Sequence, residues 1–432
     1  MVDSLKSLIF GAADRINMTI VPFDRFDRAL ETVDKLSLPE KAVIFANDVK
    51  QNWLMTGGRL YWSMKPNDLG DQAIWQGLAT ATFTMLGDRG TVPLLLEGQQ
   101  LLQNVNGDNR LSRGVDRRDG PSLVDPSRTN RYAGDYRYIQ QCSESSLIGH
   151  LYGLWALLNF GFDQHKEQIS AMLDGLAERI VKDDFQLKDA DGTPAKHGDL
   201  RPLTAPWHFG SRKPVAVAAV GALFGLAYLA TRANKYKVAY EGWTEKNLVD
   251  ISYPETHLLW VHPIYQDILA YMVLQMLISI ERDSQVCRPA ILSAFNSAMR
   301  RQWDKNCEEG NPFYTYAVQM SIGRVDARHL QKAEQILMEF NTDPRLGPTG
   351  KQPGSVVNSN GPLSHGSFIW GPKWLRGGAR HAKQPLPIYR RPAQDIFWQR
   401  NPYGLDGHSD RSYNCLDFLV GYGMGRQAGL LN

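Results

Sequence analysis

The fold of this chain is decided by a stretch early in the sequence, NDLGDQAIWQGLATATFTML (Asn67–Leu86). A polar loop there runs into a helix-forming segment that is apolar on every face and carries small residues. Helices that are apolar all round are buried, and small residues let neighbouring helices approach closely. The same pattern recurs at Cys142–Phe160, Trp207–Ala230, Tyr253–Leu277, Gly310–Ile322 and Gly404–Gly425. We therefore expect six buried helices whose N-terminal loops share one rim.

Six further segments alternate with the buried helices and are amphipathic. Apolar residues recur in them at positions i, i+3, i+4 and i+7, which is typical of a helix with one solvated face. They are Asp24–Leu36, Val92–Val105, Gln164–Val181, Tyr236–Val249, Arg288–Trp303 and Ala327–Phe340. The alternation predicts an all-α fold, an (α/α)6 toroid of six helical hairpins with an inner and an outer ring. Residues 1–432 would form this single domain.

Other architectures receive less support from the sequence. An open α-solenoid would show a repeat of about 34 or 40 residues, and the sequence contains none. Strand patterns are sparse, so Lys41–Phe45 and Arg59–Trp62 are expected to form at most a small β-hairpin. Residues 347–385 are rich in Gly, Pro, Ser and Asn, and segments of that length are usually functional or disordered. The tryptophans at 370 and 374 favour an ordered flap over the rim.

The composition is that of an ordinary globular protein. Of 432 residues, 43% are hydrophobic and 22% are charged, and the net charge of +3 is too small to indicate nucleic-acid binding. The four cysteines show neither a CxxC motif nor a Cys/His spacing typical of a metal site. We therefore expect thiols without a disulfide framework, no metal and no cofactor.

No segment indicates export or a membrane span. The N-terminal stretch MVDSLKSLIFGAADRINM lacks a basic region followed by a long apolar one, and the longest apolar runs contain charged residues within about 20 positions. We expect a cytoplasmic protein or, if it is of phage origin, a virion-associated one. Virion or homo-oligomer partners are possible, and membrane insertion is not expected.

Three acidic residues stand where the predicted rim would gather them. Asp71 begins the first buried helix, Glu144 begins the second, and Asp135 precedes Glu144. Hydrolysis of a glycosidic bond uses two carboxyl groups on opposite sides of the scissile bond. Asp71, Asp135 and Glu144 are therefore the predicted catalytic residues, with Asp116 as a fourth candidate. The structural alternative for Asp71 is a helix N-cap.

Aromatic, basic and amide side chains accompany these acids along the rim. Aromatic faces pack on sugar rings, while arginine, histidine and amide groups bind sugar oxygens. The predicted substrate-binding residues are Trp75, Gln76, Tyr136, Arg137, Trp207, His208, Arg212, Trp260, His262, Asp406 and His408. A metal is not predicted in the last of these loops, because the His-x-Asp pair His408 and Asp410 is a weak signal alone and no third ligand is identified.

The sequence lacks the common motifs of nucleotide and nucleophile chemistry, such as GxSxG, the P-loop and HExxH. The segment DADGTPAKHGD (Asp189–Asp199) is only superficially like a calcium loop, because it lacks the third acidic position and the closing Glu. We expect a turn at the tip of a hairpin there.

Four phrases of the sequence, GDQAIWQGLATA, SESSLIGHLYGL, DADGTPAKHGDL and LDFLVGYGMGRQAG, carry a resemblance. The region 68–429 resembles a loosely characterised group of bacterial proteins that have (α/α)6-toroid folds and that themselves resemble glycoside hydrolases. The resemblance implies the fold more than the activity. The group reads Ser-Arg-Asp-Gln where this chain has Ser143, Glu144, Ser145 and Ser146. It reads Asp-Tyr-Leu-Leu-Pro-Tyr-Trp-Met-Gly-Arg where this chain has Asp417–Arg426.

Three functions are compatible with the sequence. The leading prediction is a carbohydrate-active enzyme, a glycoside hydrolase that cleaves a polysaccharide or oligosaccharide by carboxylate acid/base catalysis. The first alternative is a polysaccharide lyase, in which Tyr136 or His208 removes the C5 proton of a uronic acid and Arg137 or Arg212 neutralises its carboxylate. The second is a noncatalytic glycan-binding or structural component of a phage virion.

Overall fold

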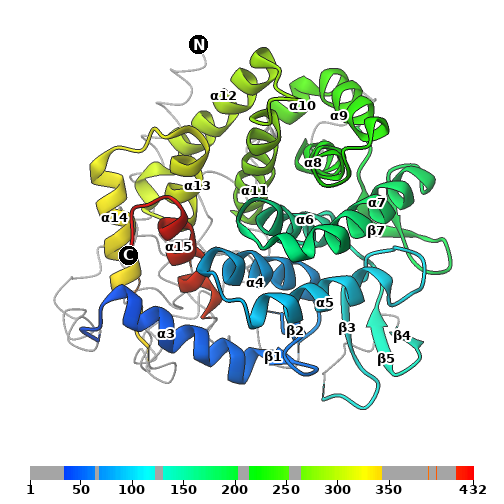
Figure 1. Ribbon diagram of the computed structural model, residues 1–432, viewed down its shortest axis with the longest axis horizontal. Helices are drawn as coiled ribbons and strands as arrows, with labels where there is room; N and C mark the ends of the chain where they lie inside the picture. Colours follow the sequence, from blue (N-terminus) through cyan, green and yellow to red (C-terminus); the bar gives the residue numbers. More distant parts are fainter. Residues whose placement is uncertain are drawn as a thin grey trace, which may run out of the picture.

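The computed structural model describes residues 34–63, 68–121, 130–202, 214–252, 264–342, 388, 396 and 415–432. Within them an inner ring of helices closes on itself (Figure 1). Each inner helix packs against the next, and the last packs against the first. The inner helices are α4 (Gln72–Leu86), α6 (Glu144–Phe160), α8 (Pro214–Thr231), α11 (Ile264–Glu281), α13 (Pro312–Ile322) and α15 (Leu416–Gln427).

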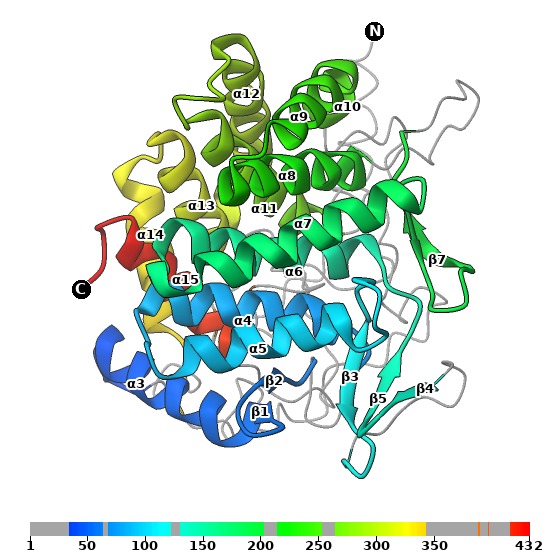
Figure 2. The same cartoon turned by 45° about the vertical axis from the view of Figure 1, so that its right-hand side comes forward.

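An outer layer of helices surrounds this ring, as Figure 2 shows for α5, α7 and α9. The outer helices are α3 (Leu38–Asp48), α5 (Thr91–Asn104), α7 (Lys166–Lys182), α9 (Asn234–Lys246), α12 (Pro289–Asn306) and α14 (Ala327–Met338). Each packs on the inner helix before or after it in the chain, except that α3 packs on α15 and completes the circle. The predicted (α/α)6 toroid is confirmed.

Short elements connect the helices of the described residues. They are η2 (Val49–Trp53), η3 (Asp163–His165), α10 (Leu248–Ser252), η4 (Cys307–Glu309), β1 (Leu54–Met55), β2 (Leu60–Tyr61), β3 (Gly114–Arg117), β4 (Asn130–Ala133), β5 (Tyr136–Ile139), β6 (Gln186–Lys188) and β7 (Pro194–Asp199). The strands form three antiparallel sheets, in the orders β1-β2, β3-β5-β4 and β6-β7. The three-stranded sheet is larger than the small hairpin that the sequence predicted. The predicted turn does join β6 to β7, with the backbone N–H of Asp189 donating to the Thr193 carbonyl at 2.8 Å.

The outer helix that packs on α15 is α3, at Leu38–Asp48. Most of Asp24–Leu36 lies outside the described residues, and Lys41–Phe45, predicted as a strand, belongs to α3. The helix begins there because both the backbone N–H and the hydroxyl of Ser37 donate to the Glu40 carboxylate, at 2.8 and 2.6 Å. This is the reciprocal half of a capping box, and it outweighs a five-residue strand pattern. The strand β2 therefore pairs with β1 instead.

The inner helices are buried on all sides, as their sequences predicted. In α8, every residue from Pro214 to Tyr228 is buried. Among the described residues α8 alone is long and apolar enough to cross a membrane, but 83% of its apolar window is buried inside the protein. That burial is typical of the core helix of a toroid.

The tightest contact in the ring lies between α4 and α6. A Cβ atom on Gly77 would lie 1.8 Å from the carbonyl oxygen of Gly149, and a Cβ on Gly149 would lie 2.4 Å from the Cα of Ile74. Likewise, a Cβ on Gly153 would lie 2.8 Å from the carbonyl oxygen of Gly77. Backbones can approach this closely only where no side chain intervenes. The glycines therefore fix the two helices side by side and in register.

A buried polar network ties this helix pair to the outer helix α5. His150 Nε2 lies 3.1 Å from Gln103 Oε1, and the Gln99 amide donates to the His150 carbonyl at 2.9 Å and lies 3.3 Å from its Nδ1. Burial lowers the pKa of His150 to about 3. The ring is therefore neutral, and it donates at Nε2 and accepts at Nδ1.

We predict that Gly149→Ala lowers the free energy of unfolding by about 1–3 kcal/mol, because the added methyl group must push α4 and α6 apart. Chemical denaturation measures the change. Gly242→Ala is the matched control, since a Cβ there meets nothing within 4 Å. Alanine at this exposed position of α9 should be neutral or stabilising by about 0.5–1 kcal/mol. Equal effects of the two variants would contradict the close approach.

We also predict a pH dependence of stability from His150. Because its pKa falls from 6.5 in the unfolded chain to about 3 in the fold, the unfolded chain binds more protons between these values. Stability should therefore fall as the pH drops from 6.5 toward 3, by up to about 1.4 kcal/mol per pH unit from this residue. Denaturation between pH 7 and 4 should show a shallower slope for His150→Gln, whereas His197→Gln at an exposed position should keep the wild-type slope. Parallel slopes for wild type and His150→Gln would contradict the assignment.

Candidate functional site

The N-terminal ends of the inner helices carry acidic residues. Asp71 is the N-cap residue of α4, and Glu144, Asp267 and Asp417 lie in the first turns of α6, α11 and α15. An outer helix returns the chain between successive inner helices, so the inner helices run in one direction and these ends share one rim. Negative charge is stabilised at helix N-termini, which is the structural reason for acids there.

Glu144 is the acid that the structure turns toward the axis of the ring. Its Oε1 accepts a hydrogen bond from the Gln266 amide of α11 at 3.1 Å. Helices α6 and α11 also contact each other directly, although α8 lies between them in the order of the ring, so this bond lies on the inner side of the ring. Glu144 is half-buried, with its Oε2 atom buried, and it lies at the N-terminal end of the inner helices, which we call the mouth of the toroid.

Asp71 lies at the same end of the neighbouring helix, and it is paired. Its carboxylate accepts from Arg113, whose guanidinium also donates to the carbonyls of Gly70 and Gln141. The Asp71 side chain does not cap α4, so the N-cap alternative does not describe its role. The Asp71–Arg113 ion pair and the hydrogen bonds from Arg113 to the carbonyls of Gly70 and Gln141 together join the loops that precede α4 and α6.

Asp135 lies apart from these two acids. It is exposed in the turn between β4 and β5, at the end of the sheet away from α4. The sheet meets α4 at its other end, where the N–H of Ala73 donates to the Arg113 carbonyl at 3.0 Å. The three steps between the four residues of β5, at about 3.3 Å each, put roughly 10 Å between the two ends. The expectation that Asp135 joins Asp71 and Glu144 is therefore not met.

The side chains beside Asp135 serve the sheet. Arg137 donates to Asp116 at 3.4 Å and to the Gly120 carbonyl at 2.6 Å, and the Asp116 carboxylate also accepts the Arg117 N–H at 2.7 Å. Tyr136 is half-buried and pairs with Arg117 across the strands. These contacts give Arg137 and Asp116 a structural role.

Trp75 and Gln76 were predicted to bind substrate, but both are buried. Trp75 is 3% exposed and Gln76 is fully buried. Gln76 accepts the Tyr61 N–H at 2.7 Å and donates to the carbonyls of Arg59 and Leu95 at 2.9 and 2.8 Å. Its amide therefore holds β2 and α5 against α4.

The remaining predicted site residues lie outside the described residues. They are Trp207, His208, Arg212, Trp260, His262, Asp406 and His408, together with the flap at 347–385.

Sequence reasoning overlooked several polar residues of the rim. Buried Asp267 accepts from Gln302 at 2.7 Å and from Lys305 at 2.9 Å, beside the Gln266 that holds Glu144. Asp417 accepts the Ile396 N–H at 2.9 Å, and Asn311 donates to the Ile396 carbonyl at 2.7 Å. The signal used for Glu144, an acid or amide at the start of a buried helix, would also have identified Asp267, Asp417 and Asn311.

Aromatic side chains fill the inside of the ring below this rim. Tyr271 and Tyr314 stack with ring centroids 4.4 Å apart, and Tyr152 meets Phe313 edge-on at 6.3 Å. The Tyr152 hydroxyl donates to Gln275 Oε1 at 2.8 Å, and burial raises its pKa well above the ordinary value. This aromatic layer fills the ring below its mouth.

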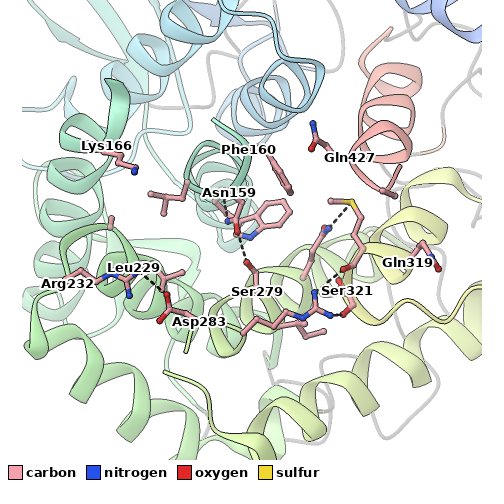
Figure 3. A pocket seen from close by; sticks show the side chains of 18 residues that line it. Asn159, Phe160, Lys166, Leu229, Arg232, Ser279, Asp283, Gln319, Ser321 and Gln427 are labelled. Atoms are coloured by element: carbon pink, nitrogen blue, oxygen red, sulfur yellow. Dashed lines mark hydrogen bonds and ion pairs between the residues drawn. The ribbon is translucent and has the colours of Figure 1, made fainter. Parts of the chain in front are cut away.

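A cavity of about 910 Å³ lies at the opposite end of the ring, between the C-terminal ends of α6, α8, α11, α13 and α15 (Figure 3). Arg232 and Asp283 pair there at 3.0 Å, and Ser279 donates to Asn159 at 3.0 Å. Arg282 donates to the carbonyls of Met320 and Ser321, and so caps the C-terminal end of α13. None of the predicted site residues lines this cavity.

Comparisons with known proteins give a likeness of fold only. No family model matches the sequence, and a search of curated proteins finds no relative. A sugar epimerase from a ruminal bacterium is similar in structure, with a TM-score of 0.46 and 9% identity over 90% of this chain and 99% of that one. The cellobiose 2-epimerase from Spirochaeta thermophila has a TM-score of 0.40 and 12% identity over 91% of this chain and 97% of that one. At this identity neither neighbour indicates a function for this chain.

We predict that Gln76→Leu acts on stability. The change leaves one N–H and two carbonyls buried without their partner, at about 1–3 kcal/mol for each unsatisfied group. Gln100→Leu on α5 is the control, since the exposed Gln100 amide only accepts from Gln168. It should change the free energy of unfolding by no more than about 0.5 kcal/mol. A Gln76→Leu variant as stable as wild type would contradict the structural role.

Proposed function

We propose that this chain is a carbohydrate-active enzyme in which Glu144 transfers a proton at the N-terminal mouth of the toroid. The observation that carries the proposal is the Glu144–Gln266 hydrogen bond, since it turns a half-buried carboxyl toward the axis of the ring. The amide fixes the orientation of that carboxyl, as an acid/base catalyst requires.

The sequence favoured one specific reaction for such an enzyme, the hydrolysis of a glycosidic bond. It needs a second carboxyl group on the other side of the scissile bond. Asp71 supports this form, because the glycine contacts between α4 and α6 keep the start of each helix at the same level. Glu144 would then protonate the leaving oxygen, and Asp71 would act on the opposite face of the sugar.

A one-base reaction is the second candidate. Epimerisation next to a carbonyl and elimination from a uronic acid both begin when a base removes a proton from carbon. The pairing of Asp71 with Arg113 and of Asp267 with Lys305 supports this candidate, because both carboxylates then have structural partners and Glu144 would act without a second acid. The names of the two fold neighbours state epimerisation for those proteins; for this chain the candidate rests on the two paired carboxylates.

Isotope labelling separates these reactions. The protein would be incubated with neutral and uronic-acid oligosaccharides in H₂¹⁸O and, separately, in D₂O, and the products would be weighed by mass spectrometry. Hydrolysis gives fragments that carry ¹⁸O. Epimerisation gives a product of unchanged length that carries one deuterium from D₂O. Elimination gives a fragment that is lighter by one water than the hydrolysis product.

We predict that Glu144→Gln lowers kcat by about 10²- to 10⁴-fold, because glutamine keeps a group that accepts from Gln266 but cannot transfer a proton. Glu167→Gln is the matched control, an exposed acid in the first turn of the outer helix α7. It should leave kcat unchanged. Sugar binding without conversion by the wild type would overturn the proposal in favour of a noncatalytic glycan-binding protein.

A further inference from the structure

A group of metal-binding side-chain types lies outside the candidate site, where η4 meets the start of α14. Cys307 and Glu308 come from η4, and His329 comes from α14. One donor atom from each lies within 4.8 Å of the others. Three different ligand types thus converge from two segments that are separated in sequence.

The imidazole of His329 is buried between Asp326 and Trp303. Its Nδ1 lies 2.8 Å from Asp326 Oδ1 without the geometry of a hydrogen bond, and its ring packs edge-on against Trp303 at 5.2 Å. Asp326 is itself held, because it caps α14 by accepting the His329 N–H at 3.0 Å. The Asp326 carboxylate therefore lies beside Nδ1, the position in which metal-binding histidines commonly have a carboxylate next to the nitrogen that does not bind the metal. That leaves Nε2 to face Glu308, whose Oε1 lies 3.6 Å away.

A cationic group already lies between these two acceptors. An Nη atom of Arg328 is 3.0 Å from Glu308 Oε1 and 3.2 Å from His329 Nε2. Arginine has no acceptor, so His329 Nε2 must offer its lone pair to the guanidinium. The Arg328 side chain is 70% exposed, and exposed ion pairs contribute little to stability. An ion that binds the same acceptors can therefore displace it at small cost.

We propose that Cys307, Glu308 and His329 form a site for a single Zn²⁺ ion. Thiolate, imidazole and carboxylate together are a ligand set for zinc, and not for calcium or magnesium. On binding, the Cys307 thiol releases its proton to water and a Zn–S bond forms. Tetrahedral zinc ligands lie about 3.3–3.8 Å apart, so the donor atoms must close by roughly 1 Å. The fourth position is left for water.

The ion would join the turn between α12 and α13 to the start of α14. Cys307 and His329 are far apart in the sequence and belong to none of the common zinc motifs, which is why the sequence predicted no metal. The site is independent of Glu144 and of the proposed catalysis.

Metal titration of the full chain, freed of metal with a chelator, tests the proposal. Zn²⁺ should bind with one equivalent, and Co²⁺ should give the thiolate-to-cobalt absorption band of a site with one cysteine. Cys307→Ser should lose this band, and His329→Gln should weaken Zn²⁺ binding by at least about 10-fold. Cys287→Ser is the matched control, because Cys287 is an exposed free thiol, and it should bind like wild type.

Arg328→Ala gives a test that does not depend on loss of function. Removing the competing guanidinium should tighten Zn²⁺ binding, and Zn²⁺ should raise the Tm of wild type and Arg328→Ala but not of Cys307→Ser. The proposal is overturned if no single equivalent binds, if Cys307→Ser and His329→Gln bind like wild type, or if Arg328→Ala weakens binding.

Discussion

The close approach of α4 and α6 is the constraint on which the rest of the structure depends. Glycines at positions 77, 149 and 153 remove the side chains that would separate the two backbones. The outer helix α5 then adds Gln99 and Gln103, which bind His150 beside the contact. With this pair fixed in register, Asp71 and Glu144 begin their helices at one level, and the remaining inner helices close the ring around a shared mouth.

Much of this fold could be predicted because buried helices have a clear apolar pattern in the sequence. A helix such as α8, surrounded by other helices, is apolar on every face, and the alternation with amphipathic segments predicts two rings. Short elements have weaker sequence patterns. The strand β5 pairs with partners on both sides, which local patterns do not reveal, and α3 depends on a cap formed by Ser37 and Glu40.

The candidate site was less predictable, because a residue type does not specify which way its side chain points. Trp75 and Gln76 lie only one turn from Asp71, yet the helix directs both into the core. Asp135 was close to Glu144 in sequence, but the strand β5 carries it away from the helices. The partner that fixes Glu144, Gln266, lies 122 residues further along the chain, and only the closed ring brings the two together.

A crystal structure of the Glu144→Gln variant with an oligosaccharide would test the central claim most directly. The account predicts a sugar at the mouth of the toroid, with a ring or glycosidic oxygen within about 3 Å of the side chain at position 144, the reach of a hydrogen bond. A sugar bound instead in the cavity at the C-terminal ends of the inner helices, against Asn159 and Asp283, would contradict it.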